Sequence, residues 1–425
     1  MTDATQPRMG RGTMLPVAIM AAALFALLAF APFASAASDP LAGGTTTIKL
    51  NKGFFKKLKK NDVKVLKVSP GKVKNRTVTL PVSGGSLDPT TGQGTVNDSG
   101  GFKFKHGKRT AALKNLVLDT TKKSLSAKFG KKNLKVASVA GISFTREGFG
   151  TNVKIGKLKL TGKAAKELNK KLGFGSKSNK KHKRASASSK DNSSSQGPFK
   201  ANQVLGGSAS TTQPSTVTVL PVGNMTYNGD ATLLKKLNDV EVKVQTLGLT
   251  TQTGTAFSAP IIGGTISPTG TAGVVQSGIG VKLVQNLLLG PSTTITLGGM
   301  YVDLAAKTVT VEVVAESNAE SEGKKPLNLG NLGRSSIADI TVTGVTADPT
   351  TRTVSVNASA ALQPISAEVL EGFVKVYQGY LTEFLIKVGG KPKAEAEAIA
   401  AAKVANDHIK SGESLGTFSF TAQTQ

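Results

Sequence analysis

A repeated stretch of turn residues constrains the fold of this chain more than any other feature. Residues 80–101 and residues 259–278 carry proline and glycine at matching places and align at one constant offset. The matched pairs are Pro81 with Pro260, Gly84 with Gly263, Gly85 with Gly264, Pro89 with Pro268, Gly94 with Gly273 and Val96 with Val275. Proline fixes φ and glycine permits positive φ, so each copy predicts a strand, a Gly-Gly kink, a turn and a second strand. Such a duplication predicts a chain built from two similar β-rich units.

Composition supports an all-β architecture held together by packing. The 425-residue chain has no Cys and no Trp, and its segments rich in Val, Thr and Ile are separated by Gly and Pro. We predict a mainly β fold, with two tandem antiparallel β-sandwich-like domains that each carry one or two short helices. The predicted domains are residues 45–212, with a disordered basic Ser/Lys insertion at 174–198, and residues 213–425.

Helices are predicted where apolar residues recur at helical spacing. Phe54, Phe55 and Leu58 predict a short helix, which is matched in the second unit by residues 231–240. A later helix in each unit is expected to begin at a capping hydroxyl, Thr161 in the first and Ser366 in the second. Residues 391–405 form a further helix by propensity. The stripes on these helices are predicted to be core.

The N-terminus has the features of an export signal. Arg8 and Arg11 precede an apolar run from Met14 to Phe33, which ends in Ala34-Ser35-Ala36. This arrangement predicts a secretory signal peptide over residues 1–36, cleaved before Ala37, with an uncleaved membrane anchor as the alternative. The expected location is extracytoplasmic, either secreted or associated with the cell surface.

Charge is divided unevenly between the two units. Residues 45–200 contain 37 Lys and Arg against 7 Asp and Glu, whereas residues 201–425 contain 15 against 17. A polycationic first unit beside a near-neutral second unit predicts that the first unit meets a polyanion.

The residues expected to bind this polyanion lie on a strand and on the insertion. They are Lys103, Lys105, Lys108 and Arg109 within the fold, and Lys180, Lys181, Lys183 and Arg184 on the insertion. The insertion is interpreted either as a plain solvated loop or as a polyanion-binding arm. Anionic cell-wall polymer is preferred as the partner, with a membrane surface as an alternative. Nucleic acid is disfavoured because Phe102 and Phe104 are predicted to point inward and so provide no stacking platform.

Catalytic and metal-binding patterns are not found in the sequence. It has no thiol, no glycine-rich phosphate loop and no His-Glu-x-x-His spacing, and its three His are at 106, 182 and 408. Asp119 and Asp303 occupy the same place before a turn, where a backbone-capping role is expected. The chain is therefore predicted not to be an enzyme and to hold no metal.

The order of these motifs resembles a known family. Phe55-Lys-Lys-Leu58 in an amphipathic opening, the Gly-Gly turn, the strand ending at His106-Gly107, and the closing strand, helix and insertion are similar to the haem-transport-associated HtaA-type domain of Gram-positive surfaces. The resemblance implies two degenerate copies, a two-sheet β fold, and haem capture through a Tyr on the opening segment supported by a His.

The sequence departs from that family pattern at the ligand. Leu58 and Leu237 stand where the resemblance places the Tyr, and the first unit contains no Tyr at all. Asn286 or a neighbour corresponds to His106, which leaves His106 as the candidate haem ligand.

Three functions follow from these observations. The leading hypothesis is a non-catalytic envelope protein whose first domain binds anionic polymer. The competing hypotheses are a module that takes haem or another apolar ring into a pocket between sheets, and a structural or adhesive repeat protein.

Overall fold

The computed structural model describes residues 38–174, 197–288, 290–317 and 330–425. The predicted signal segment lies outside the described residues. So does most of the Ser/Lys insertion, including Lys180, Lys181, Lys183 and Arg184.

The first half of the described chain folds into an 11-stranded antiparallel sheet. Its strands are β1 (Asp39–Leu50), β2 (Val63–Val68), β3 (Lys72–Lys74), β4 (Thr77–Leu87), β5 (Gly94–Asp98), β6 (Gly101–His106), β7 (Arg109–Asp119), β8 (Ser124–Phe129), β9 (Lys132–Glu147), β10 (Gly150–Leu160) and β11 (Val204–Pro214). The sheet closes on itself, because β7 pairs with both β5 and β8 at the ends of the path β5-β4-β1-β11-β10-β9-β8. Strands β6 and β2 extend from β7 outside this ring.

The second half forms a 12-stranded sheet among the described residues. Its strands are β12 (Val217–Val219), β13 (Asn224–Gly229), β14 (Val242–Leu247), β15 (Thr251–Thr253), β16 (Ala256–Ile266), β17 (Gly273–Ser277), β18 (Gly280–Asn286), β19 (Ser292–Asp303), β20 (Thr308–Ser317), β21 (Gly330–Asp348), β22 (Thr353–Leu362) and β23 (Ser414–Gln423). It closes in the same way, because β17 pairs with both β16 and β19.

The strand pairings show that the two sheets are copies of one topology. In the first sheet β1 lies between β4 and β11, and in the second sheet β13 lies between β16 and β23. The outer pair β2–β6 corresponds to β14–β18. The predicted fold class is confirmed: the chain is mainly β, with two tandem antiparallel sheets of sandwich-like form.

The duplicated glycines have the role expected of them. Gly85 in β4 and Gly264 in β16 have φ of +113° and +124°. A Cβ at either position would collide with a backbone carbonyl of the neighbouring strand, Thr95 O or Val274 O. Both sheets shift register at this point, so the Gly-Gly kink is a β-bulge that bends the strand.

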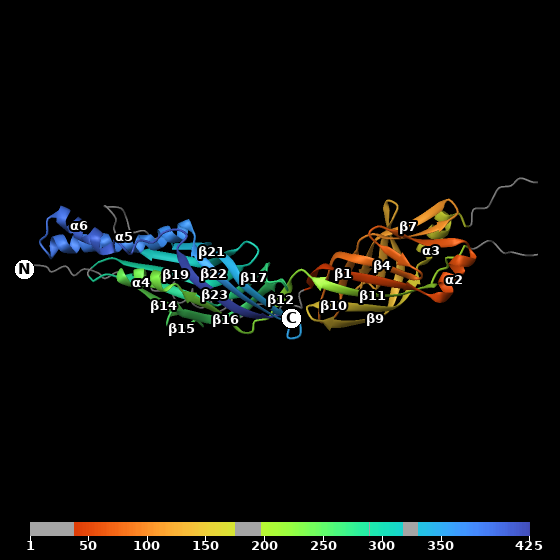
Figure 1. Ribbon diagram of the computed structural model, residues 1–425, viewed down its shortest axis with the longest axis horizontal. Coiled ribbons are helices and arrows are strands. Elements are labelled where there is room, and N and C mark those ends of the chain that lie inside the picture. The colour runs from red at the N-terminus through yellow and green to blue at the C-terminus, as the bar shows by residue number, and fades with distance from the viewer. Residues whose placement is uncertain (1–37, 175–196, 289, 318–329) are drawn as a thin grey trace, which may run out of the picture. The chain divides into compact units, whose positions relative to one another are not determined.

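Two helices of each half sit at corresponding places. The helices are α2 (Lys52–Lys60) and α3 (Gly162–Leu172) in the first half, and α4 (Ala231–Asp239), α5 (Pro364–Lys387) and α6 (Lys393–Val404) in the second. Helix α2 corresponds to α4 and α3 to α5, and α6 has no counterpart among the described residues of the first half. Helices α2 and α3 lie at the same end of the first sheet, and α5 and α6 run side by side (Figure 1). No helix among the described residues is both long enough and apolar enough to cross a membrane.

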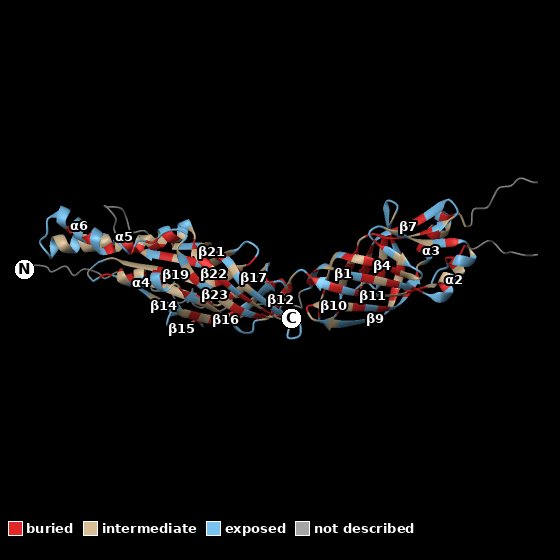
Figure 2. Cartoon of the chain, viewed as in Figure 1, coloured by how far each residue is buried: buried red, intermediate tan, exposed pale blue. Residues whose placement is uncertain are grey.

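Burial alternates along the strands because successive side chains point to opposite faces. Figure 2 shows this alternation on strands such as β1 and β22. The inward residues of each sheet and the buried edges of its helices form the core, which includes Leu58 of α2 and Leu237 of α4. The predicted stripes of α2 and α3 are thus core, although Phe55 is only partly buried, and those of α4 and α5 belong to or pack against the core of the second sheet.

Candidate functional site

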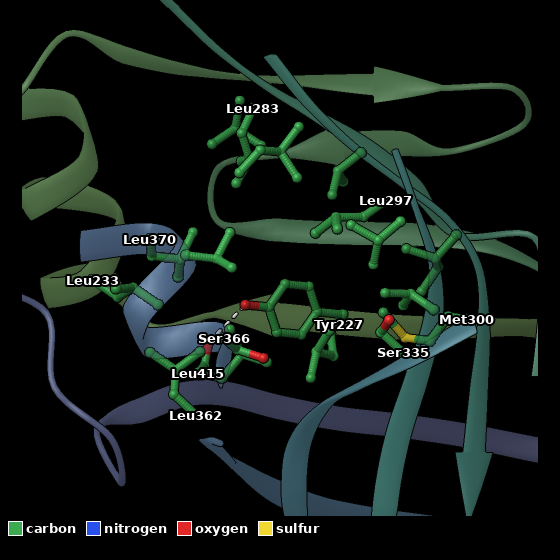
Figure 3. Close-up of a pocket in the computed structure, with 18 of the residues that line it drawn as sticks. Tyr227, Leu233, Leu283, Leu297, Met300, Ser335, Leu362, Ser366, Leu370 and Leu415 are labelled. Atoms are coloured by element: carbon green, nitrogen blue, oxygen red, sulfur yellow. Dashed lines mark hydrogen bonds between the residues drawn. The ribbon is translucent and has the colours of Figure 1, made fainter. Parts of the chain in front are cut away.

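An apolar cavity of about 420 Å³ lies inside the second half. Its walls come from strands of the closed sheet, from α4 and from the first turns of α5, and Figure 3 shows the side chains converging on it. No described residue that lines it carries a charge. The volume falls within the range of pockets that hold small ligands, and most of the surface is aliphatic or aromatic.

Three aromatic rings line one wall of the cavity. Tyr227 of β13 is paired in register with Phe257 of β16 on one side and with Phe418 of β23 on the other. Its ring stacks on both, with centroids 5.8 Å from Phe257 and 4.9 Å from Phe418. The three near-parallel rings form a continuous stack across three neighbouring strands, which we call the aromatic wall.

The hydroxyl of Tyr227 is already engaged. It donates a hydrogen bond of 2.6 Å to the carbonyl oxygen of Leu415, shown as a dashed line in Figure 3. Burial raises the pKa of the Tyr227 phenol above its usual range, because the charged phenolate would lose its hydration. Tyr227 therefore stays neutral.

Three serines supply the other polar atoms of the lining: Ser335, Ser336 and Ser366. The prediction that Ser366 caps its helix is wrong. Helix α5 begins earlier, with Gln363 as N-cap and Pro364 in its first turn, so Ser366 lies inside the helix and lines the cavity. The Thr161 cap of α3 is confirmed, since its hydroxyl accepts from the Ala164 amide.

The first half distributes its aromatic residues differently. Register places Ile48, Val78 and Ser208 where the second half has the aromatic wall. The first half instead directs rings inward from α2 and β6: Phe54, Phe102 and Phe104 are all buried, and Phe104 packs edge-on against Phe199 at 4.9 Å.

The corresponding inward residues of the second half are smaller. Helix α4 and strand β18 carry Leu233, Val281 and Leu283 in the positions of Phe54, Phe102 and Phe104. All three line the cavity. The centre that the first half fills with phenylalanine rings is thus lined by aliphatic side chains in the second half.

His106 has structural contacts in the first half. Its Nδ1 lies 3.0 Å from the carbonyl oxygen of Leu172 at the end of α3, and its ring stacks on Phe174 at 4.4 Å. The strand pairing places Gln285, the neighbour of Asn286, at the same position in the second half. Gln285 donates to the carbonyls of Val240 and Phe373, so both residues tie a strand to a helix.

These residues do not fit haem. Leu58 and Leu237 are fully buried core residues where the family resemblance implies a Tyr ligand, and leucine has no donor atom. Tyr227 is kept neutral and hydrogen-bonded, and the described lining offers no cation for the propionates. Among the described residues no cluster of three or more His, Cys, Asp or Glu could hold a metal ion.

The predicted polyanion-binding residues lie on two faces of the first sheet. Lys103 and Lys105 lie on the face that β6 turns away from its buried phenylalanines, and Lys105 is directly opposite Lys64 of β2. Lys108 is exposed in the turn after His106. Arg109 pairs with His106 on the other face, where its guanidinium packs against Gly173 at the end of α3.

The class of protein defined by this geometry is a duplicated, closed antiparallel β-sheet protein with an apolar cavity in its second copy. No family model and no curated protein matches the sequence. Among solved structures, the chain is similar to the C-terminal domain of HtaA from Corynebacterium glutamicum, with 10% identity over 49% of this chain and 99% of that one and a TM-score of 0.32.

Two further solved structures from the same organism are similar. The N-terminal domain of HtaA is 11% identical, over 48% of this chain and 97% of that one, with a TM-score of 0.32. The heme binding protein HtaB is 14% identical, over 49% of this chain and 95% of that one, with a TM-score of 0.30.

Proposed function

We propose that this protein is a non-catalytic binding protein whose second half carries an apolar ligand. The cavity carries the proposal: it has about 420 Å³, an aromatic wall, and no charged residue among the described residues that line it. Burying the apolar surface of a ligand against such a lining is favourable, and the polar side chains among the described lining residues carry hydroxyls. A bound ring or chain would lie against the aromatic wall of Tyr227, Phe257 and Phe418.

The test introduces two phenylalanines of the first half at the equivalent positions of the second half. Val281→Phe and Leu283→Phe give β18 the residues of β6, which should fill the cavity with rings. We expect the full chain to bind a fluorescent apolar probe, with the enhancement and blue shift of a buried fluorophore. The double variant should weaken this binding by on the order of tenfold or more, because the space is occupied.

The matched control is Leu288→Phe, the same change at a residue that is exposed and lies outside the lining. It should bind the probe like the unmodified chain. Equal probe binding by the control and the cavity-filled variant would show that the probe binds elsewhere and would refute the proposal.

We propose, as a second function, that the first half holds the protein on an anionic surface. The observation in favour is the pairing of Lys64 with Lys105 across β2 and β6, with Lys103 beside them. Among the described residues none of these three ammonium groups has a carboxylate within ion-pair distance. Like charges directly opposite each other repel, and a bound polyanion would relieve that repulsion. An anionic wall polymer fits an exported protein.

A further inference from the structure

Positive charge gathers on the helices at one end of the first sheet. Helices α2 and α3 lie at this end (Figure 1) and contain five and four lysines, with Glu167 as the one acid within their bounds. Phe199 joins the two helices: its ring lies 6.0 Å from that of Phe54 of α2, and its carbonyl accepts a hydrogen bond of 2.8 Å from Asn169 of α3. We call α2, α3 and Lys200 the basic end. Among the described residues none of its lysines lies within ion-pair distance of a carboxylate.

Helix α4 of the second half corresponds to α2 residue by residue. Each has nine residues, and each follows an Asn or Asp cap whose side chain accepts from the amides two and three residues on. Lys56 of α2 therefore matches Lys235 of α4, and the lysine that follows each also matches. In α4 both lysines are ion-paired, one to a carboxylate of the helix and the other, at 2.8 Å, to a carboxylate just before β23.

The acids that neutralise α4 have no equivalents in the first half. Lys60 occupies the position of Asp239. Gln203 occupies the position of Glu413: its side-chain oxygen accepts from the Lys200 amide at 3.0 Å, the same contact that Glu413 makes in the second half. The hydrogen bond is thus kept and the negative charge is not.

Helices α3 and α5 repeat this difference. Asn169 of α3 and Glu371 of α5 both accept a hydrogen bond from equivalent backbone amides before the closing strand. Three residues earlier, Lys166 stands where α5 has Glu368. Because the same backbone contacts form with neutral and with acidic side chains, the fold does not require the acids to be absent from the first half.

The basic end is electrostatically unfavourable without a partner. Lys52, Lys56 and Lys60 are exposed and follow one another four residues apart on one face of α2. Their Cβ atoms are then about 5–6 Å apart, and like charges at this spacing destabilise a helix. Partial burial and then repulsion from Lys200 lower the pKa of Lys57. A row of bound anions would relieve these repulsions.

The surface of the basic end favours a polymer over a membrane or a nucleic acid. No large apolar residue of α2 or α3 is exposed, so the helices lack the anchors that enter a bilayer. Phe55 is half-buried with the Lys59 ammonium 5.2 Å from its ring centre, so it is not a free platform for a base. Lysine binds phosphate as a compact point charge, which suits evenly spaced charges on a chain.

We propose that the basic end is a binding site for an unbranched phosphate polymer, such as poly(glycerol phosphate), whose successive phosphates lie along Lys52, Lys56 and Lys60. The proposal rests on the attachment function proposed above for the first half. It names the chemical class of the polyanion and adds a site on the helices to the lysines of β2 and β6.

The experiment gives the first half the acids of the second. Lys60→Asp with Gln203→Glu should form the ion pairs of α4 with Lys56 and Lys57, which also favours folding. Fluorescence anisotropy of labelled poly(glycerol phosphate) measures binding to the full chain over a salt series. The exchange variant should bind on the order of tenfold or more weakly, and the slope of log K against log salt should fall by about two to three, because three lysines are lost to the polymer.

The matched control is Lys154→Asp with Gln213→Glu, which makes the same change of charge at exposed residues of β10 and β11. It should keep the affinity to within about threefold. Replacing Lys52, Lys56 and Lys60 together with Gln removes the row without adding an acid and should weaken binding like the exchange variant. Equal losses in the control and in both helix variants would show that net charge alone governs binding and would overturn the inference.

Two further outcomes concern the partner. Tighter binding of phosphatidylglycerol vesicles or of single-stranded DNA than of the polymer would assign this surface to another partner and overturn the inference. Failure of the polymer to bind, while retention on cell wall still depends on the lysines of β2 and β6, would overturn the inference and leave the attachment function standing. Failure of both would overturn both.

Discussion

At the scale of single residues, the interior of the first sheet holds a buried acid. Asp98 of β5 is 2% exposed, and burial raises the pKa of its carboxyl to about 7, which the nearby Thr46 hydroxyl only partly offsets. Thr46 is itself bonded to Ser210 at 2.9 Å. Ser277 occupies the structurally equivalent position in the second half. The first half alone therefore has an acid at this place, and its stability depends on that acid's protonation.

The sign of the pH dependence follows from the raised pKa. The folded state holds the Asp98 proton more tightly than the unfolded state, so its contribution to stability is complete below about pH 4 and is lost as pH rises to about 7. Asp98→Asn should remove a slope of up to about 1.4 kcal/mol per pH unit from the unfolding free energy in this window. Urea midpoints of the variant and the unmodified chain between pH 4 and 8 measure the difference.

The control for this prediction is Asp88→Asn. Desolvation alone would raise the pKa of Asp88, but the hydrogen bonds from Thr90 and Thr91 together outweigh it and lower that pKa, so the contribution of Asp88 to stability is lost at acid pH instead. A stability difference between Asp98→Asn and the unmodified chain that is constant from pH 4 to 8 would contradict the assignment.

At the scale of elements, the outer strand pair β2–β6 gathers positive charge on one face of the first half. Its outward face carries Lys64, Lys103 and Lys105, while the other face of β6 buries Phe102 and Phe104, as the alternating sequence predicts. Burial of the two rings fixes which face of β6 points inward. Because strand residues alternate between faces, Lys103 and Lys105 then lie together on the outward face. Arg109, predicted to belong with them, lies on the opposite face.

The charged face yields a test of surface attachment. Lys64→Gln, Lys103→Gln and Lys105→Gln together should reduce retention of the full chain on isolated Gram-positive cell wall by on the order of tenfold. Retention of the unmodified chain should fall steeply as salt is raised. The control is Lys282→Gln, which occupies the place of Lys103 in the second sheet. Undiminished retention of the triple variant would count against this face as the binding surface.

At the scale of the whole molecule, two copies of one topology have diverged in opposite directions. The first is strongly basic and has phenylalanine rings in its centre, and the second is near neutral and has an apolar cavity. Duplication permits this divergence because each closed sheet has its own core. We propose that one copy attaches the protein and the other carries its ligand.

A haem titration tests the molecule as a whole. Because Tyr227 of the described lining is neutral and hydrogen-bonded to Leu415, and that lining has no cation, we expect no Soret shift characteristic of protein-ligated iron when the full chain is titrated with haem. Absorbance spectra with buffer and a haem-binding protein as references decide the question. A shift abolished by His106→Ala would show that His106 ligates iron and would reverse our interpretation of that residue.

Features that depend on local chemistry could be predicted from the residues alone. Positive φ at Gly85 and Gly264, inward Phe102 and Phe104, the Thr161 cap and the Asp119 and Asp303 turns follow from residue type and short-range periodicity. Because the duplication repeats these signals, the fold class could be predicted.

The position of the cavity could not be predicted from the residues and is known from the folded chain. Its lining joins residues far apart in the chain, such as Tyr227 and Leu415, and it depends on a strand register, a bulge at Ile337 and an α5 that begins before Ser366. Apolar residues that fill a core and apolar residues that line a cavity have the same sequence pattern, since both point inward from the same strands. Whether they meet or leave a space is set by side-chain sizes across the whole closed sheet, which no local pattern records.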